Sequence, residues 1–205
     1  MAARTNSVDP RAERVRTRLR EAAFALAHEC PVDQLTVGAI VARASVSRQV
    51  FYQHFTDRDD AVATAFTVAF AAETADMGVL DGTAGGGGDA RARILRLFDF
   101  AAEHRSMYRN IVPSAVTQRV VTAFRAELQP ACEAIATHGM PVVSPIAGLT
   151  PESVSRFLVG GFMEVLRSWM EDPDSTDLGG RVSAALDTVD GLLGLNTYSK
   201  GDHHG

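Results

Sequence analysis

Apolar residues recur along this chain at intervals of three and four positions, and no segment sustains an alternation of apolar and polar residues. In the first such segment, Val15, Leu19 and Leu26 fall on one helical stripe, and most of the neighbouring arginines lie off it. The same spacing predicts helices over residues 10–29, 37–44, 48–55, 58–77, 89–104, 105–112, 114–138, 151–171 and 180–197. The pattern therefore predicts an all-α fold.

Capping residues and helix breakers mark the ends of these helices. Asp9, Thr36, Ser47 and Asp57 each precede a predicted helix, where a side-chain oxygen can accept the first free N–H groups. Residues 78–89, GVLDGTAGGGGD, predict a surface loop because a run of glycines does not hold a helix. The later helices are expected to end at Pro113, Gly139, Pro141, Pro145 and the stretch 173–180.

Charge is unevenly distributed along the chain. Residues 1–58 hold nine Arg and six acidic residues, which gives +3, whereas residues 59–205 hold eleven basic and nineteen acidic residues, which gives −8. We therefore expect a domain over 1–58 that faces a polyanion and a larger helical domain over 59–205. A charge of +3 does not demonstrate nucleic-acid binding by itself, because many solvated helices are as basic.

The composition is that of a soluble globular protein. Hydrophobic residues make up 46% of the chain, and no stretch reaches the eighteen uninterrupted apolar residues that a membrane span needs. We therefore expect a cytoplasmic protein with no membrane partner. Cys30 and Cys132 lie in no disulfide or metal spacing and are predicted to be buried thiols, so neither a metal nor a cofactor is expected.

The segment with the clearest functional signature is 36–59, TVGAIVARASVSRQVFYQHFTDRD. Two short helices joined by a tight turn would bury one apolar set against the first helix: Ile40, Ala44, Val46, Val50, Phe51 and Phe55. The exposed face of the second helix then carries polar side chains: Ser47, Arg48, Gln49, Tyr52, Gln53 and His54. Arg can bond to guanine and Gln to adenine in the major groove, whereas Ser, Tyr and His suit phosphate oxygens. This arrangement predicts a helix-turn-helix that binds double-stranded DNA.

In this segment the chain resembles the TetR family of transcriptional regulators. The family pattern is read in Thr36-Val37, Ile40-Val41, Ala44-Ser45-Val46-Ser47, Phe51-Tyr52-Gln53-His54-Phe55 and Arg58. Three residues depart from it: Ser45 replaces the turn glycine, Cys30 replaces a glycine after the first helix, and Arg58 replaces a lysine. A left-handed turn would therefore have to be adopted by Ser45.

The resemblance implies roles for single residues of the motif. Phosphate contacts are implied for Thr36, Tyr52, His54 and Arg58, and base contacts for Arg48 and Gln49. Two alternatives stay open at this stage. The Tyr52 ring could pack between helices and offer only its hydroxyl, and His54 could bond to a neighbouring helix.

The acidic part of the chain contains a helix that is apolar around most of its circumference. Apolar side chains in 151–171 cover about two-thirds of the helical wheel, so this helix must bury more than one face. The TetR resemblance implies that it and the last helix form a four-helix bundle with a second subunit; a buried central helix in a monomer is the alternative. The implied interface residues are Phe157, Gly161, Val165, Val189 and Leu193.

Large, adaptable side chains in the same part of the chain could line a cavity for a small molecule: Phe98, Met107, Tyr108, Phe124, Phe162, Met163 and Trp169. Each would suit an ordinary core equally well. Because few charges lie on these helical stripes, we expect a mostly apolar effector. The prediction is a ligand-responsive regulator, most simply a repressor that binds a palindromic operator as a homodimer and releases it when the effector binds.

Two other classes of function stay open. The chain contains no HExxH, GxSxG or P-loop motif, so an enzyme is not expected, although a small all-α enzyme remains an alternative. The second alternative is a helical partner-binding protein that no longer binds DNA. We interpret the His203–His204 pair as part of a tail rather than as a metal site.

Overall fold

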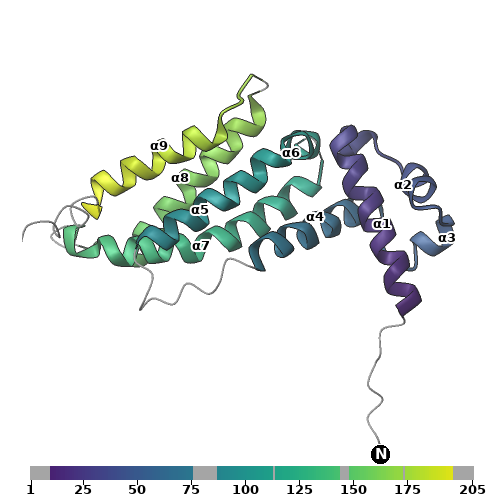
Figure 1. Ribbon diagram of the computed structural model, residues 1–205, viewed down its shortest axis with the longest axis horizontal. Helices are drawn as coiled ribbons and strands as arrows, with labels where there is room; N and C mark the ends of the chain where they lie inside the picture. Colours follow the sequence, from purple (N-terminus) through teal and green to yellow (C-terminus); the bar gives the residue numbers. More distant parts are fainter. Residues whose placement is uncertain (1–9, 76–86, 113, 144–147, 173, 196–205) are drawn as a thin grey trace, which may run out of the picture. The chain divides into compact units, whose positions relative to one another are not determined.

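A computed structural model describes residues 10–75, 87–112, 114–143, 148–172 and 174–195. Within these ranges the chain forms α-helices and one short 3-10 helix, and no strand (Figure 1). The helices are α1 Pro10–Glu29, α2 Val37–Ala44, α3 Arg48–Phe51, α4 Arg58–Ala75, α5 Gly87–Glu103, α6 Arg105–Ile111, α7 Val116–Val143, α8 Pro151–Glu171 and α9 Leu178–Leu192, with η1 at Val32–Gln34. The predicted all-α fold is confirmed.

Three of the predicted caps are present. In Thr36, Ser47 and Asp57, a side-chain oxygen accepts a hydrogen bond from the backbone N–H of the residue three positions later. The distances are 3.1, 3.2 and 2.8 Å. These bonds satisfy donors that the first turn of a helix leaves free, which is why α2, α3 and α4 begin where the sequence predicts. Asp9 and most of the predicted loop 78–89 lie outside the described residues.

The bounds of three helices differ most from the prediction, and one of them, α9, spans Leu178–Leu192 rather than 180–197. Helix α3 ends at Phe51 rather than Phe55, because residues 52–54 form turns. Helix α7 does not end at His138 but continues through Gly139 and Pro141. Gly139 is buried, and a Cβ placed on it would lie 2.9 Å from Leu193 Cδ1, so close packing of the chain's last helical segment covers this turn of α7. Tertiary packing thus stabilises a turn that local propensity disfavours.

The described residues divide into two compact units. Unit 1 comprises residues 10–69 and 106–120, and unit 2 comprises residues 70–105 and 121–195, apart from the positions that the structure does not describe. The division falls inside α4 and α7, so unit 1 contains more of the chain than residues 10–58.

Unit 1 is built around α1. Leu19 and Ala23 of α1, Ile40 of α2 and Phe51 of α3 are fully buried. From residue 106 onward α6 belongs to this unit, and near its end the Asn110 amide donates to the carbonyl of Ala27 at 2.9 Å. The predicted burial of Ile40, Ala44, Phe51 and Phe55 is confirmed, but Val46 and Val50 are only half-buried.

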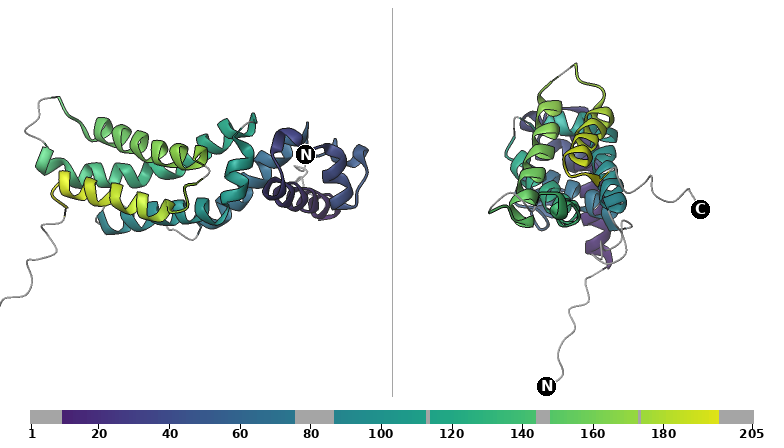
Figure 2. Two further views of the ribbon diagram at one scale, coloured as in Figure 1. Left: turned by 90° about the horizontal axis from the view of Figure 1, so that it is seen from above. Right: turned by 90° about the vertical axis from the view of Figure 1, so that its left-hand side faces the viewer.

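Unit 2 is a helical bundle in which α9 packs against α5 and α8 (Figures 1 and 2). Aromatic rings from several helices meet in its core: Phe98 lies 5.1 Å from Phe124 and 6.2 Å from Phe162, and Phe70 stacks on Phe124 at 5.5 Å. At the surface, Arg91 of α5 pairs with Asp187 and Asp190 of α9. None of the described helices is both long and apolar enough to cross a membrane.

Candidate nucleic-acid interface

The turn between α2 and α3 is held in a left-handed conformation by a serine. Ser45 has φ 54° and ψ 50°, and it is the one non-glycine residue of the described ranges with positive φ. Its N–H donates to Ala42 O at 3.2 Å, and the next N–H, that of Val46, donates to Val41 O at 3.0 Å. This pair of bonds is the Schellman motif that commonly ends a helix, usually with glycine at the left-handed position. The hydrogen bonds therefore hold a left-handed turn although Ser45 stands where a glycine was expected.

Arginines from other helices clamp the chain on both sides of helix α2. At its C-terminal end, Arg18 of α1 donates to the carbonyl oxygens of Ala44 and Ser45. In the segment just before α2, Nη1 of Arg58 in α4 donates to the carbonyls of Asp33 in η1 and of Leu35, at 2.5 and 2.7 Å. The predicted phosphate contact Arg58 therefore already uses Nη1 within the protein, and Arg18, which the sequence pattern did not single out, positions the turn. A charged donor aimed at a helix C-terminus would have been the sequence signal for Arg18.

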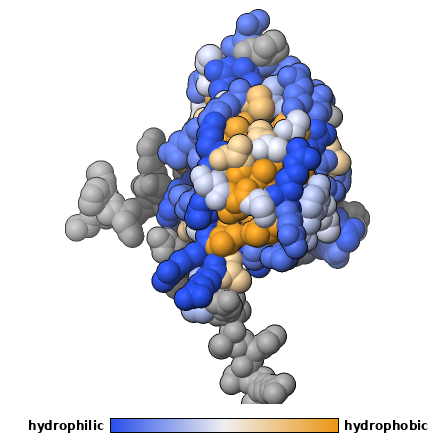
Figure 3. Space-filling model, turned by 90° about the vertical axis from the view of Figure 1, so that its right-hand side faces the viewer, coloured by the Kyte–Doolittle hydropathy of each residue, from blue (hydrophilic) through white to orange (hydrophobic). Residues whose placement is uncertain are grey.

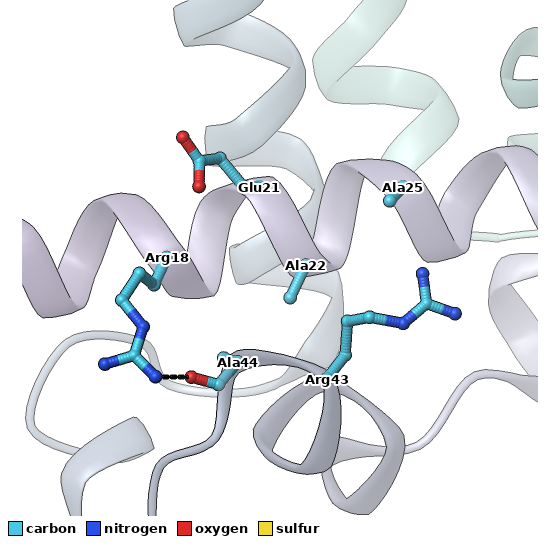
Figure 4. A pocket seen from close by; sticks show the side chains of 6 residues that line it. All are labelled: Arg18, Glu21, Ala22, Ala25, Arg43 and Ala44. Atoms are coloured by element: carbon cyan, nitrogen blue, oxygen red, sulfur yellow. Dashed lines mark hydrogen bonds between the residues drawn. The ribbon is translucent and has the colours of Figure 1, made fainter.

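A shallow hollow of about 340 Å³ lies between α1 and α2, lined by Arg18, Glu21, Ala22, Ala25, Arg43 and Ala44 (Figure 4). Both of its arginines are engaged in holding the two helices together. Arg43 forms a two-pronged ion pair with Glu29 of α1, at 2.8 and 2.7 Å. Hydrogen bonding to Arg43 holds the pKa of Glu29 below its ordinary value, and the same bonds raise the pKa of Arg43. None of the predicted effector-binding residues lines this hollow.

Most of the predicted DNA-binding residues lie on an exposed face. Thr36, Ser47, Arg48, Gln49 and Tyr52 are exposed, whereas His54 and Arg58 are half-buried. Arg48 lies across the start of α2, where a Cβ on Gly38 would be 3.1 Å from the Arg48 Nη2 and 3.5 Å from the Thr36 Oγ1. Because Gly38 has no side chain, the Arg48 side chain of α3 can lie beside Thr36, the N-cap of α2, on the same face.

The Tyr52 side chain does not pack between helices. It is 59% exposed, and its ring meets the Phe51 ring in a T-shaped arrangement with 5.3 Å between the ring centres. Its hydroxyl is therefore accessible to a partner outside the chain. This exposure fits the phosphate role better than the packing alternative.

The start of α4 carries an acidic cap that links it to α7. Asp60 accepts from the Thr56 N–H at 3.1 Å and from Arg119 of α7 at 3.1 Å. Burial alone would raise the pKa of Asp60, but these hydrogen bonds outweigh it and the pKa lies below its ordinary value. Arg58 and Asp60 both lie in the first turn of α4. This one turn therefore bonds both to the segment before α2 and to α7.

This arrangement of an α1 support, a capped α2, a left-handed turn and an exposed α3 corresponds to a known sequence family. Residues 19–63 match the family described as bacterial regulatory proteins, tetR family. The matched segment is a helix-turn-helix of the TetR type. It covers the motif that the sequence pattern predicts. No curated protein matches the chain in sequence.

Solved structures share the fold of this chain along most of its length. The dihydroxyacetone kinase operon activator DhaS has 15% sequence identity and a TM-score of 0.63, covering 88% of this chain and 97% of its own. The regulator FadR from Bacillus subtilis, solved with stearoyl-CoA, has 17% identity and a TM-score of 0.62, covering 84% and 96%. A TetR-family transcriptional regulator from Streptomyces coelicolor has 20% identity and a TM-score of 0.60, covering 92% and 84%. At these identities the likeness establishes a common fold.

The predicted dimer residues differ in exposure. Phe157 is 75% exposed, Gly161 is exposed with no atom within 4 Å of a Cβ placed on it, and Val165 and Val189 are half-buried. Leu193 is 7% exposed and packs against Gly139 within its own chain, so it is not available at the surface. Its neighbour Leu192 is 69% exposed. A helical wheel could not separate these two leucines, because α9 ends at Leu192.

The predicted effector-binding residues are all buried and fall into both units. Phe98, Phe124, Phe162, Met163 and Trp169 belong to unit 2, where the three phenylalanines form one ring cluster. Met107 and Tyr108 belong to unit 1, where the Tyr108 ring contacts Phe66 at 5.7 Å. Phe70 and Phe100, which the sequence prediction omitted, belong to the aromatic core of unit 2. Their positions beside other buried rings emerge only when the helices pack.

The cysteines and the acidic residues form no further site among the described residues. There, no three His, Cys, Asp or Glu side chains gather as metal ligands would, and the His203–His204 pair lies outside these ranges. Cys132 is buried as predicted, and burial raises the pKa of its thiol to about 12. Cys30 is only half-buried.

Proposed function

We propose that this protein is a ligand-responsive repressor that binds a palindromic operator as a homodimer and is released by a mostly apolar small molecule. The observation that carries the proposal is the face formed by Thr36, Arg48, Gln49 and Tyr52, which is exposed and polar. Arg48, Gln49 and Tyr52 lie in or directly after α3, whose N-terminus is capped by Ser47. The turn before α3 is fixed by the hydrogen bonds of the Ser45 and Val46 N–H groups. Rigid presentation of a few donors is what base reading in the major groove requires.

Within this proposal the residues divide into two groups. Arg48 and Gln49 read base edges, while Thr36, Ser47, Tyr52 and His54 contact phosphates. Arg58 makes its phosphate contact with a guanidinium that also clamps α2. Residues 1–58 form the DNA-binding domain and residues 59–205 the effector and dimerisation domain of a cytoplasmic protein.

The dimer is proposed to form through α8 and α9. Phe157 and Leu192 expose large apolar surface, and the open surroundings of Gly161 leave space for a partner helix. Exposed apolar area of this kind is costly in a monomer and favourable at a subunit interface. Val165 and Val189 would complete the interface, with Leu192 in the place predicted for Leu193.

The effector is proposed to bind within unit 2 among Phe98, Phe124, Phe162, Met163 and Trp169. Flexible Met and large rings can rearrange around an apolar ligand. FadR from Bacillus subtilis, which shares the fold, was solved in complex with stearoyl-CoA, a molecule with a long apolar chain. The ligand would lower operator affinity by favouring a state in which the two recognition helices no longer match one helical turn of DNA, about 34 Å.

Selection of bound sequences from a random DNA pool tests the DNA-binding part of the proposal. We expect inverted half-sites, because a two-fold dimer presents two copies of α3. Arg48→Ala should relax the preference at one base pair of each half-site, whereas Tyr52→Phe should weaken all sequences alike and leave the preference unchanged. A single unrepeated element, or equal loss on random and selected DNA with Arg48→Ala, would contradict the assignment.

The dimer and effector parts are tested separately. Gly161→Glu should dissociate the dimer in sedimentation, because it places a carboxylate between two helices, whereas Gly88→Glu, at another open glycine, should not. A panel of apolar compounds should include some that both stabilise the protein thermally and lower operator affinity. Compounds that stabilise the protein and leave operator affinity unchanged would argue against the switch.

A further inference from the structure

An apolar patch lies on the face of unit 1 that carries α2 and α3. Figure 3 shows it as an orange area bordered by hydrophilic residues. The apolar residues of α2, α3 and their connecting turn that are exposed or half-buried are Val37, Ala39, Ala42, Val46 and Val50. An apolar patch with a polar border usually marks a surface that contacts a partner.

Two of these apolar residues belong to α3 and to the turn before it. Packing within the chain explains the apolar side chain of one of them, but not of the other. Val46 follows the left-handed Ser45, the position whose side chain commonly packs on the preceding helix in a Schellman motif. Val50 lies inside α3, directly after Gln49 and three residues after the cap Ser47. Its backbone N–H completes the cap, while its side chain remains half-buried, with the rest open to solvent.

The chemistry of the major groove limits what Val50 can contact there. Base edges present hydrogen-bond donors and acceptors, which an isopropyl group cannot satisfy. The one apolar group that they present is the C5 methyl of thymine. An apolar side chain beside Arg48 and Gln49 therefore complements a thymine and disfavours a cytosine at the same place.

We propose that Val50 packs against the C5 methyl of a thymine in each operator half-site and thereby helps to specify the sequence that is bound. This inference rests on the proposed DNA-binding function. Burial of one methyl group contributes about fourfold to affinity, so the preference is modest at each half-site and is multiplied across the two. A second copy of the chain or another protein is the competing occupant of the patch.

Deoxyuridine provides a direct test, because it differs from thymidine only by the C5 methyl. In the selected operator, each thymine is replaced in turn by deoxyuridine, and affinity is measured at constant salt. For the wild-type protein we expect one thymine position per half-site at which the replacement weakens binding about fourfold, and no change at the other thymines. Val50→Ala should remove this difference between thymine and uracil.

Two further variants keep the test interpretable. Val68→Ala alters an exposed valine of α4, 44% exposed, and should leave the thymine-to-uracil ratio at its wild-type value. Val50→Thr keeps the branched shape of the side chain, so it guards against misfolding of Val50→Ala, and it should reduce the ratio to about twofold because one methyl remains.

The outcomes separate this inference from the function on which it rests. Operators without a fixed thymine in each half-site, or a wild-type ratio near one at every thymine, would overturn the inference while DNA binding stands. A ratio that persists in both Val50 variants would overturn it too, as would a Val50→Ala variant that changes the oligomeric state and not the ratio. Absence of any sequence-dependent binding would instead reject the proposed function itself.

Discussion

In unit 1, Arg18 and Arg58 donate to backbone carbonyls on both sides of α2, whereas in unit 2 Arg91 of α5 pairs with two carboxylates of α9 at the surface. A bond to a carbonyl fixes the course of the backbone, while a surface ion pair links two side chains and contributes little to stability. Both kinds of bond occur in each unit, since Arg43 pairs with Glu29 in unit 1 and Arg105 donates to the carbonyl of Ser175 in unit 2. The carbonyl bonds of unit 1, however, flank the helix that precedes α3. Unit 1 must present α3 in one geometry, and unit 2 must hold a core that can adapt.

The packing between helices also differs from place to place. In unit 1, small residues such as Ala22, Ala25 and Ala44 lie where α1 meets α2, although the rings of Phe51 and Phe66 are buried elsewhere in this unit. In unit 2, Phe98, Phe124 and neighbouring rings fill the space between helices. Each ring buries a large apolar area, so stability is concentrated in a few side chains.

The largest expected effect is the loss of a ring from the core of unit 2. Phe124→Ala should lower the free energy of unfolding by about 3–5 kcal/mol, because it removes two ring contacts and leaves a cavity. Denaturant unfolding at several protein concentrations measures it. The matched variant Phe157→Ala removes a ring that is 75% exposed and should mainly weaken association, so its effect should depend on protein concentration. Equal effects of the two variants would contradict the difference in burial.

A smaller effect is expected from removing one clamp on α2. Arg58→Gln should lower the free energy of unfolding by about 1–2 kcal/mol without DNA, because the Asp33 and Leu35 carbonyls lose a charged donor. Arg48→Gln, at a proposed base reader, should leave it unchanged. If Arg58→Gln weakens DNA binding and leaves the unfolding curve of the free protein as it was, Arg58 acts as a phosphate contact and not as a clamp.

The turn offers a substitution that should stabilise the protein. Ser45→Gly relieves the steric cost of a left-handed residue and should raise the free energy of unfolding by about 1 kcal/mol, or the melting temperature by about 2–4 °C. Ser47→Ala, two residues later, removes a helix cap and should lower it by about 1 kcal/mol. Calorimetry distinguishes the two signs. A lower melting temperature for Ser45→Gly would mean that the serine side chain contributes more than its backbone costs.

The smallest expected effect concerns the two thiols, one in each unit. Burial raises the pKa of Cys132 to about 12, so at pH 8 almost none of it is the reactive thiolate, and stability should not depend on its ionisation near neutral pH. Half-buried Cys30 should therefore react first with a thiol reagent, and Cys132 only when unit 2 unfolds. Absorbance of the released reagent measures both phases, and Cys30→Ser should abolish the fast one. A fast phase that survives this substitution would show that unit 2 opens readily.

Much of unit 1 could be predicted from the sequence, because its geometry depends on local chemistry. The caps Thr36, Ser47 and Asp57 act within three residues of their own positions, and the exposed polar face of α3 follows from helical spacing. The left-handed Ser45 could also be anticipated, since the turn needs that conformation whatever residue occupies it.

Other features depended on contacts between residues far apart in the chain. The sequence pattern alone did not show that Arg18 and Arg58 bond to carbonyls 23 to 27 residues away, that Val50 stays half-open, or that Leu193 turns inward onto Gly139. A helical stripe states which residues share a face, and it leaves open which of several faces the neighbouring helices cover. Burial at those positions is decided by how closely the helices pack, because only packing determines which side chains lose their water.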